Sequence, residues 1–385
     1  MDFAFSDEQE MIRESAESFL ADVSDSAAVR AAMATALGHD PELWQRVCRE
    51  MVWPAIHIPE QYGGLGLGFV ELAILLEQMG RRLFCSPFFS TACLATPALL
   101  LGGNDEQKAH WLPQLAEGSL TATLAYASNN RSGLDAVQAS VRAEGAGFVI
   151  DGVLRQVVDG HSAGLLIVAA RGREGIGLFA VPADTPGISR RLVPTLDQTR
   201  KLAEVSFSQV VVPAEARLGA AGQGGELLER VLQLACVALA AEQVGGAQQA
   251  LDLTLAYTAE RQQFGRAIAS FQAIKHRAAD MMLEVECARS AAWYAACVAE
   301  EALAFNGDKR IAAELPLAAA LAKARCSEAF FQCAAESIQL HGGVGFTWEY
   351  DPHLYFKRAR ASEALFGAPS WHRERIAAAL LGEYP

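Results

Sequence analysis

The stretch YTAERQQFGRAIASFQAIKHRAADM, residues 257–281, decides how this chain is interpreted. Arg261 and Phe264 are three residues apart, so on a helix they would share a face and present a guanidinium beside an aromatic ring. Such a pair suits a phosphate next to a flat heterocycle, because arginine can bind phosphate oxygens through two parallel hydrogen bonds. The structural alternative is that Arg261 only pairs with Glu260 or Asp280 on a solvated surface.

Two further segments extend this pattern. Phe271-Gln272 follows within the same stretch, and the segment QLHGG occupies residues 339–343. The order R-x-x-F-G, then F-Q, then Q-x-x-G-G on three C-terminal segments resembles the acyl-CoA dehydrogenase family. The likeness covers nearly the whole chain, from residue 5 to residue 367.

The resemblance implies an α+β fold with an N-terminal helical domain at residues 1–120, a middle β-barrel at 121–218 and a C-terminal four-helix bundle at 219–385. It implies an FAD-dependent oxidoreductase of lipid metabolism that oxidises an acyl-CoA thioester and delivers electrons to an electron-transfer flavoprotein. Family members are dimers or tetramers built through the bundle, with FAD across the subunit interface. The matching positions imply these FAD-binding residues: Arg261, Phe264, Phe271, Gln272, Gln339, Gly342 and Gly343.

Length and composition agree with such an enzyme. The chain has 385 residues, of which 51% are hydrophobic, enough for two or three domains with buried cores. A net charge of −13 argues against nucleic acid as a partner. The start of the chain lacks the pattern of a signal peptide, and no apolar run is long enough to span a membrane. Eight cysteines without a C-x-x-C and histidines without metal-ligand spacing predict a cytoplasmic protein with no metal site.

The periodicity predicts helices at both ends of the chain and strands between them. The alternating runs are expected as strands at residues 141–143, 148–158, 165–170, 177–181 and 205–212. Asp151-Gly152 is typical of a two-residue hairpin turn. Ser6 and Gln9 form a capping-box pattern at the start of the first helix. After a glycine-rich linker, long helices are expected at residues 226–263, 270–305, 316–339 and 352–365.

The resemblance weakens where the chemistry requires a base. Removing the α proton of a thioester needs a carboxylate within hydrogen-bond reach, and most family members place a Glu directly before a Gly near the C-terminus. The matching position here is Phe366, before Gly367, and a phenyl ring cannot accept a proton. Some relatives place the Glu on the helix before Arg261, but that position is Ala235 here.

Cys236 and Glu363 lie close to these two positions in the sequence. Cys236 stands where many members have an Arg that contacts CoA. Glu363 lies one turn from Phe366 and is the weak alternative base. Its displacement of roughly 5 Å far exceeds the ~0.5 Å that catalytic geometry tolerates, which favours an ion-paired or solvated helix residue.

The strand region departs from the family pattern as well. Ser128-Asn129-Asn130-Arg131 stands where relatives show a Thr-Glu-Pro-like run beside the flavin. Gln156 and Val158 replace an aromatic residue and a hydroxyl near flavin N5. The alternative is neutral drift, because backbone groups make many of the family's flavin contacts.

Three hypotheses stay open at this point. The favoured one is a subunit of a heteromeric acyl-CoA dehydrogenase, a heterodimer or heterotetramer in which a homologous partner supplies the base. Such enzymes include those that shorten bulky acyl chains, as in steroid breakdown. The second is a self-sufficient flavoenzyme with another base or different flavin chemistry. The third is a non-catalytic binding or scaffold protein that keeps the fold.

Overall fold

The computed structural model describes residues 5–304 and 306–382. The chain divides into two compact units, each of which is described by itself. The helical unit contains Met1–Arg30, Phe69–Phe84 and Cys236–Pro385. The β unit contains Ala31–Gly68 and Cys85–Ala235. The predicted domain limits at residues 120 and 218 stay a prediction.

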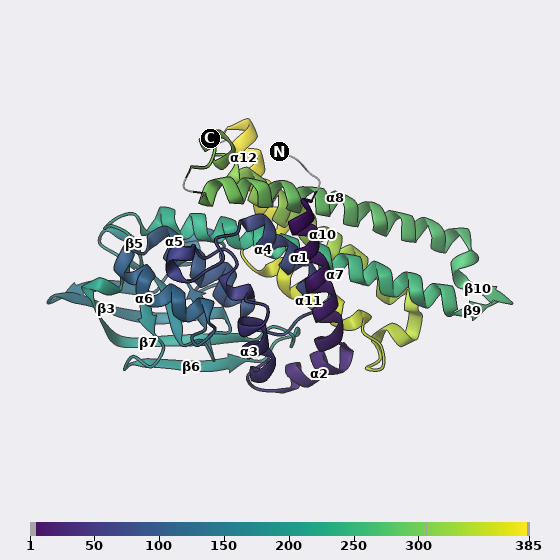
Figure 1. Ribbon diagram of the computed structural model, residues 1–385, viewed down its shortest axis with the longest axis horizontal. Helices are drawn as coiled ribbons and strands as arrows, with labels where there is room; N and C mark the ends of the chain where they lie inside the picture. Colours follow the sequence, from purple (N-terminus) through teal and green to yellow (C-terminus); the bar gives the residue numbers. More distant parts are fainter. Residues whose placement is uncertain (1–4, 305, 383–385) are drawn as a thin grey trace. The chain divides into compact units, whose positions relative to one another are not determined.

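The β unit is built on one eight-stranded sheet, so the predicted β-rich middle of the chain is confirmed (Figure 1). Its order is β6-β7-β3-β2-β4-β5-β8, and β1 pairs in parallel with β4. The outer strands β6 and β8 are not paired with each other in the part of the chain that the structure describes. The strands are β1 (Ala122–Ala125), β2 (Ser140–Glu144), β3 (Gly147–Val158), β4 (Leu165–Gly172), β5 (Gly175–Pro182), β6 (Ile188–Val193), β7 (Leu202–Pro213) and β8 (Arg217–Leu218).

Alternation along the strands builds the core of this unit. On β7 the buried residues Val205 and Phe207 alternate with partly exposed ones, as expected for a strand with one buried face. The sequence missed β1, β6 and β8, which are short or carry charged residues. The helices of this unit are α3 (Pro41–Arg49), α5 (Thr96–Gly102), α6 (Asp105–Ala116) and the π-helix η3 (Phe89–Ala95).

The predicted hairpin turn at Asp151-Gly152 is wrong. Both residues lie inside β3, at a register shift between Ile150 and Gly152. Asp151 is used there as an acceptor, because its Oδ1 receives the backbone N–H of Gln209 at 2.7 Å. The turn that joins β2 to β3 instead lies at residues 145–146, where Gly145 has a φ of 59°.

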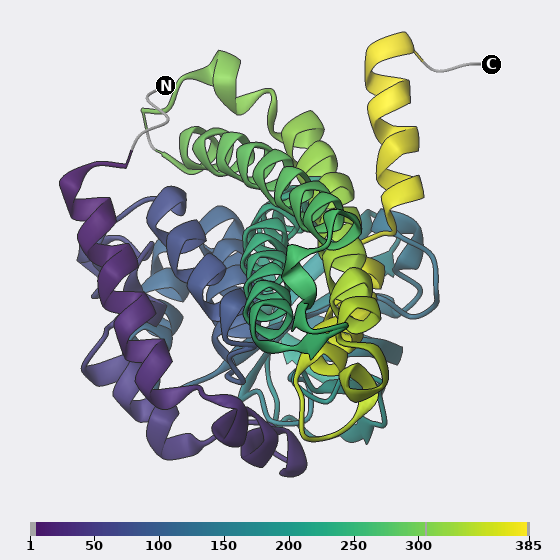
Figure 2. The same ribbon diagram turned by 90° about the vertical axis from the view of Figure 1, so that its right-hand side faces the viewer.

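The helical unit is dominated by long helices, as predicted. Helices α8 (Gln272–Leu303) and α11 (Pro352–Ala364) both pack on α10 (Leu315–His341), and Figure 2 views the long helices nearly end-on. The predicted end of α8 at Phe305 lies outside the described residues. Ser6 and Gln9 form the predicted capping box on α1. The other helices are α1 (Asp7–Val23), α2 (Ser26–Ala34), α4 (Phe69–Arg81), α7 (Gly224–Glu260), α9 (Lys309–Ala312) and α12 (Pro369–Leu381).

Two glycines let helices α4 and α7 approach at backbone distance. A Cβ atom on Gly80 would lie 1.9 Å from the carbonyl oxygen of Glu242, and one on Gly245 would lie 1.8 Å from that of Glu77. No side chain fits in either place. Beside this contact, Arg81 pairs with Asp252 of α7 at 2.9 Å, so the two helices are joined by both packing and charge.

Among the described residues, no helix is long and apolar enough to cross a lipid bilayer. The cytoplasmic location stays a prediction.

Candidate functional site

The R-x-x-F-G segment forms a β-hairpin at one end of the helical unit. Helix α7 ends at Glu260, and β9 (Gln262–Gln263) then pairs with β10 (Arg266–Ala267). Phe264 and Gly265 form the turn with φ values of 55° and 79°. Two consecutive residues with positive φ are typical of the tight turns that match the twist of paired strands. The prediction that Arg261 and Phe264 share a helical face is therefore wrong.

The hairpin displays its aromatic ring to solvent. Phe264 is 91% exposed, although a bulky side chain rarely adopts positive φ without a reason. The Arg266 guanidinium lies 3.9 Å from the ring centroid of Phe271, and the rings of Phe264 and Phe271 are 6.1 Å apart. The guanidinium-aromatic pair expected for Arg261 is thus formed by Arg266 and Phe271. The sequence analysis missed Arg266, which directly follows the R-x-x-F-G pattern.

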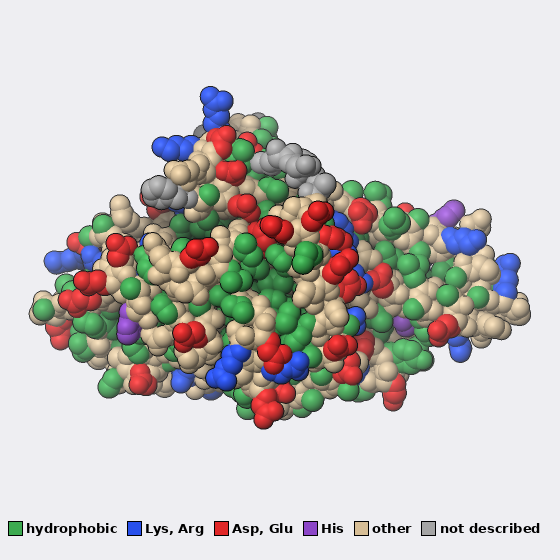
Figure 3. Space-filling view, in the orientation of Figure 1, with side chains coloured by type: hydrophobic (Ala, Val, Ile, Leu, Met, Phe, Trp, Pro, Cys, Tyr) green, Lys and Arg blue, Asp and Glu red, His purple; other side chains and the backbone are tan. Residues whose placement is uncertain are grey.

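Charge at this end of the unit is basic. Figure 3 shows Lys and Arg side chains gathered there, at the right of the view. Within the described parts of the chain, Arg261 makes no ion pair, so the alternative pairing with Glu260 or Asp280 is not observed. Residues 261–277 contain no Asp or Glu, and their basic residues are Arg261, Arg266, Lys275 and Arg277.

Aromatic stacking brings the end of α10 to the end of α7. The rings of Tyr257 and His341 stack with centroids 4.3 Å apart, and Tyr350 meets the Tyr257 ring edge-on at 6.0 Å. The structure thereby brings two predicted segments, residues 257–264 and 339–343, to one end of the helical unit. Burial lowers the pKa of His341, which keeps its ring neutral near pH 7.

This end of the unit has the groups and the space that a dinucleotide requires. A Cβ atom placed on Gly265, Gly342 or Gly343 would meet nothing within 4 Å, so a ligand can approach the backbone directly. Phe271 is half-buried, while Gln272 and Gln339 are exposed. An uncompensated guanidinium, an exposed ring and open glycines together fit the pyrophosphate and flat rings of FAD.

The second candidate site is the turn between α11 and α12, where the family base is expected. Phe366 is 8% exposed and has a φ of 59°, and Gly367 has a φ of 109°. Cys236 of α7 lies against this turn, with its Sγ 4.0 Å from the carbonyl oxygen of Phe366. Ala235, the position of the alternative base, precedes that cysteine and is also buried. Neither position carries a carboxylate.

Glu363 is held by another partner. Its Oε2 accepts a hydrogen bond from Arg360 Nη1 at 2.6 Å, one turn earlier on α11. The carboxylate is therefore ion-paired along the helix, as the sequence favoured.

A buried lysine, which the sequence analysis missed, occupies this turn. The side chain of Lys323 on α10 has no exposed surface. Its Nζ donates to Ser327 Oγ at 3.0 Å and to the carbonyl oxygens of Glu363 and Gly367 at 3.1 Å each. Burial is the largest influence and lowers the pKa of Lys323 to about 8. The only signal in the sequence was a single Lys within the alanine-rich run 318–324.

A polar network continues from Lys323 through the buried interior. Gln243 of α7 bonds both Ser327 and Ser362 through its Nε2, at 3.0 Å each. In the preceding position, Glu242 pairs with Arg358 of α11 at 3.1 Å, and both side chains are less than 10% exposed. Three helices are therefore joined by hydrogen bonds around the turn that carries Phe366.

In the β unit, the positions that depart from the family pattern carry no carboxylate, and the Ser128 hydroxyl accepts the Gln138 N–H at 3.3 Å. Residues 128–131 form an irregular loop in which Asn129 Oδ1 accepts from the Arg131 N–H at 2.8 Å. Gln156 is exposed with a φ of 56° at an irregularity of β3. Val158 is buried, and its carbonyl oxygen accepts from Thr123 Oγ1 at 2.6 Å.

These features define an FAD-dependent oxidoreductase with a helical N-terminal part, a central sheet and a C-terminal helical part. Residues 6–119 match the acyl-CoA dehydrogenase N-terminal domain, and residues 222–381 match the acyl-CoA dehydrogenase C-terminal domain. The chain belongs to the acyl-CoA dehydrogenase family.

Individual relatives resemble the chain over almost its whole length. The acyl-CoA dehydrogenase IpdE2 of Mycolicibacterium smegmatis is 34% identical over 373 residues, covering 97% of this chain and 99% of the relative. A variant of the Tcur3481-Tcur3483 steroid ACAD is 30% identical with a TM-score of 0.87, covering 97% of this chain and 98% of that one. The ChsE4-ChsE5 complex of Mycobacterium tuberculosis is 25% identical with a TM-score of 0.89, and each chain is covered completely.

The burial of Lys323 predicts a specific pH dependence of stability. Between about pH 8 and 10.5 the unfolded chain keeps the proton at this position while the folded chain has lost it. The free energy of unfolding of the wild type, relative to that of K323M, should therefore rise with pH by roughly 3 kcal/mol across this window. Urea unfolding at a series of pH values measures this difference. A difference that stays flat would mean that the lysine has its ordinary pKa.

Proposed function

We propose that this chain is a subunit of a heteromeric FAD-dependent acyl-CoA dehydrogenase that lacks the catalytic base. The reaction is the α,β-dehydrogenation of an acyl-CoA thioester, and a homologous partner subunit contributes the carboxylate. The observation that carries the proposal is Phe366, which stands in the turn where most members have a Glu.

The chemistry explains why that side chain matters. The reaction needs a group that removes the α proton and an acceptor for the hydride from the β carbon. Bound FAD supplies the hydride acceptor. Phe366 and Cys236 meet at one turn of the helical unit, and the buried thiol cannot accept the α proton near neutral pH because burial raises the pKa of Cys236 to about 11 and keeps it protonated. The ion pair of Glu363 with Arg360 weakens the case for an internal substitute.

The chain nevertheless keeps residues suited to FAD. We assign the cofactor contacts to the exposed hairpin and the glycine-rich end of α10, with Arg261 on the pyrophosphate and Phe264 beside a ring system. The remaining proposed contacts are Phe271, Gln272, Gln339, Gly342 and Gly343. Arg266 joins them as a neighbouring cation, since its guanidinium already lies on the Phe271 ring.

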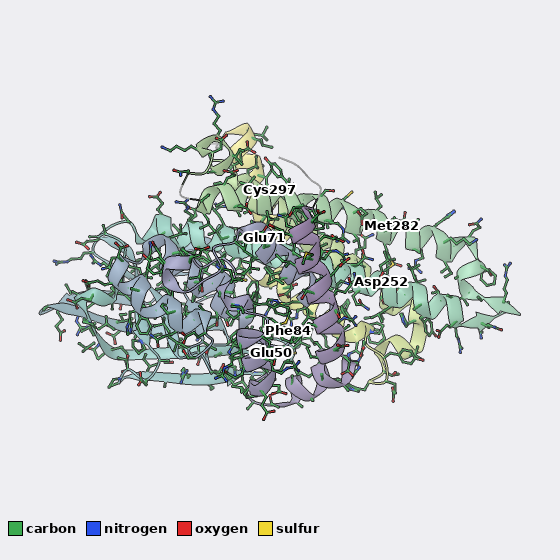
Figure 4. The ribbon with its side chains drawn as sticks, viewed as in Figure 1. Glu50, Glu71, Phe84, Asp252, Met282 and Cys297 are labelled. Carbon is green, nitrogen blue, oxygen red and sulfur yellow. The ribbon has the colours of Figure 1, made fainter. Side chains whose placement is uncertain are left out.

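A partner subunit accounts for apolar side chains on the surface of the helical unit. Met282 and Leu283 on α8 are 59% and 61% exposed, and Leu255 on α7 is 45% exposed. Figure 4 labels Met282 on α8. Such side chains gain free energy when a second chain covers them. We propose that the covering chain is a homologous subunit with a Glu-Gly pair, in a heterodimer or heterotetramer.

The relatives indicate the class of substrate and the electron acceptor. One similar structure is described as a steroid ACAD, and another is the two-component ChsE4-ChsE5 complex. We therefore propose a bulky, steroid-derived acyl-CoA as substrate and an electron-transfer flavoprotein as the acceptor. An electron-transferring flavoprotein study also supplied a similar structure, 26% identical with a TM-score of 0.89.

The division of labour between subunits can be measured by turnover. The isolated chain should oxidise acyl-CoA at least about 10² times more slowly than the assembly with its partner, since a general base contributes roughly 10² to 10⁴ in rate. Co-expression with a homologue carrying the Glu-Gly pair should restore turnover, and the Glu-to-Gln form of that homologue should not. Full acyl-CoA oxidation by the isolated homo-oligomer would reject the proposal.

The proposed FAD contacts can be tested on the same assembly. R261Q should weaken FAD binding by about tenfold or more, because it removes a charge-assisted hydrogen bond to phosphate. F264A should also weaken binding, by loss of ring contact. Q262A, which changes an exposed neighbour in β9, is the matched control and should leave the affinity unchanged. Flavin fluorescence during dilution measures release, and equal release from all three variants would show that the cofactor lies elsewhere.

A further inference from the structure

We propose that Lys323 is a positioning residue whose buried ammonium fixes the backbone conformation at position 366. The inference rests on the proposed function in one respect, namely that position 366 carries the catalytic base in related subunits. The hydrogen bonds that fix the turn are independent of that reading.

Every N–H of the Lys323 ammonium has a hydrogen-bond acceptor, either in the turn or on Ser327. Three N–H donors meet three acceptors, namely Ser327 Oγ and the carbonyl oxygens of Glu363 and Gly367. The two carbonyls lie on either side of Phe366, one at the end of α11 and one in the turn. The Lys323 ammonium therefore binds one carbonyl on each side of residue 366, those of Glu363 and Gly367.

His372 and Trp371 also contact the turn. The carbonyl oxygen of Phe366 itself lies 3.2 Å from His372 Nε2, whose pKa burial lowers to about 3. A Cβ atom on Gly367 would lie 2.6 Å from the Trp371 ring, so that position admits only glycine. The carbonyls of Glu363, Phe366 and Gly367 each have a hydrogen-bonding partner, which restricts the conformation available to residue 366.

That conformation is unfavourable for the residue that adopts it. Phe366 has a φ of 59°, a left-handed backbone that bulky side chains avoid unless their surroundings impose it. The hydrogen bonds of Lys323 to the Glu363 and Gly367 carbonyls impose this conformation together with the His372 ring at the Phe366 carbonyl.

Packing alone does not explain a lysine here. Among the described residues, no carboxylate lies within ion-pairing distance of its Nζ, and a buried charge without a counter-ion is costly. A methionine would fill a similar volume without that cost. What only the lysine provides is three donors directed at Ser327 and the turn, and Gln243 holds that serine in place by a hydrogen bond.

The consequence is that the backbone conformation at position 366, where relatives carry the base, is preserved although the base is absent. The turn that presents position 366 is held by Lys323 whether the side chain is phenyl or carboxylate. Placing a Glu at this one position should therefore give the chain a correctly placed base without any other change.

A spectroscopic experiment tests the positioning directly. The full chain carries 4-fluorophenylalanine at position 366 as its single label, and ¹⁹F NMR is recorded for the wild type, K323M and K309M. Lys309 is exposed on α9 and serves as the matched control. The wild type and K309M should give one narrow resonance at the same shift, and K323M should give a displaced resonance that is broadened or split. An unchanged resonance in K323M overturns the proposal.

If K323M does not fold by circular dichroism, K323Q replaces it. Its amide keeps two donors on a shorter side chain that cannot reach both carbonyls. The expected result is again a displaced resonance, and an unchanged one again overturns the proposal.

A kinetic experiment separates this proposal from the proposed function. In the assembly whose partner carries the Glu-to-Gln change, F366E in this chain should raise acyl-CoA oxidation by about 10² to 10⁴ over the wild-type chain and over F366Q with the same partner. Adding K323M to F366E should lower kcat at least about tenfold with KM changed less than twofold, because a misplaced base slows the step without loosening the substrate. An active F366E chain that is indifferent to K323M overturns the positioning role. An inactive F366E assembly with the expected ¹⁹F result rejects the proposed function and supports the role of Lys323.

Discussion

The hydrogen bonds of one buried ammonium organise the part of this protein where catalysis would occur. Lys323 donates hydrogen bonds to the carbonyls of Glu363 and Gly367, and it does so at the cost of burying a charge. Through Ser327 and Gln243 the same network reaches α7, and a buried ion pair between Glu242 and Arg358 lies beside it. Removing one member of such a network leaves its partners buried and unsatisfied, which is why the network specifies a single arrangement of the three helices.

The backbone of this turn is held firmly, but the side chain that it carries is not the one found in most relatives. Family members use a carboxylate at this position, and here the same backbone carries the ring of Phe366. The opposite end of the helical unit, with Arg261 and the exposed Phe264, is equipped for a cofactor. We propose on these grounds that the chain is one component of a shared active site: it has groups suited to a cofactor and the turn where relatives carry the base, but not the base itself.

Local rules predicted most of the helices and strands and failed at two turns. Asp151-Gly152 has the composition of a hairpin turn, yet pairing with β7 draws it into a bulge where Asp151 accepts the Gln209 N–H. Phe264-Gly265 was expected near a helix end, yet the pairing of β9 with β10 makes it the true tight turn. The two errors have different causes. The register of β3 depends on β7, which is distant in sequence, whereas β9 and β10 pair locally through a tight turn in a segment that was expected to be helical.

In the candidate site, some residues were suggested by sequence motifs and others became visible only in the structure. The proposed FAD-binding residues were chosen because each lies in a short motif, and stacking of Tyr257 on His341 brings two of those segments together. Lys323 could not be predicted, since a lone lysine in an alanine-rich helix is ordinarily a solvated residue. Its role becomes visible only when the carbonyls of Glu363 and Gly367 are seen to converge on it.

The most direct measurement follows the α proton itself. The purified chain is incubated with acyl-CoA in deuterium oxide, and deuterium at the α carbon is followed by mass spectrometry, with the assembled heteromer measured in parallel. The account predicts exchange no faster than in buffer for the isolated chain and rapid exchange for the heteromer. Rapid exchange by the isolated chain would show that it holds a working base, and would contradict the central claim.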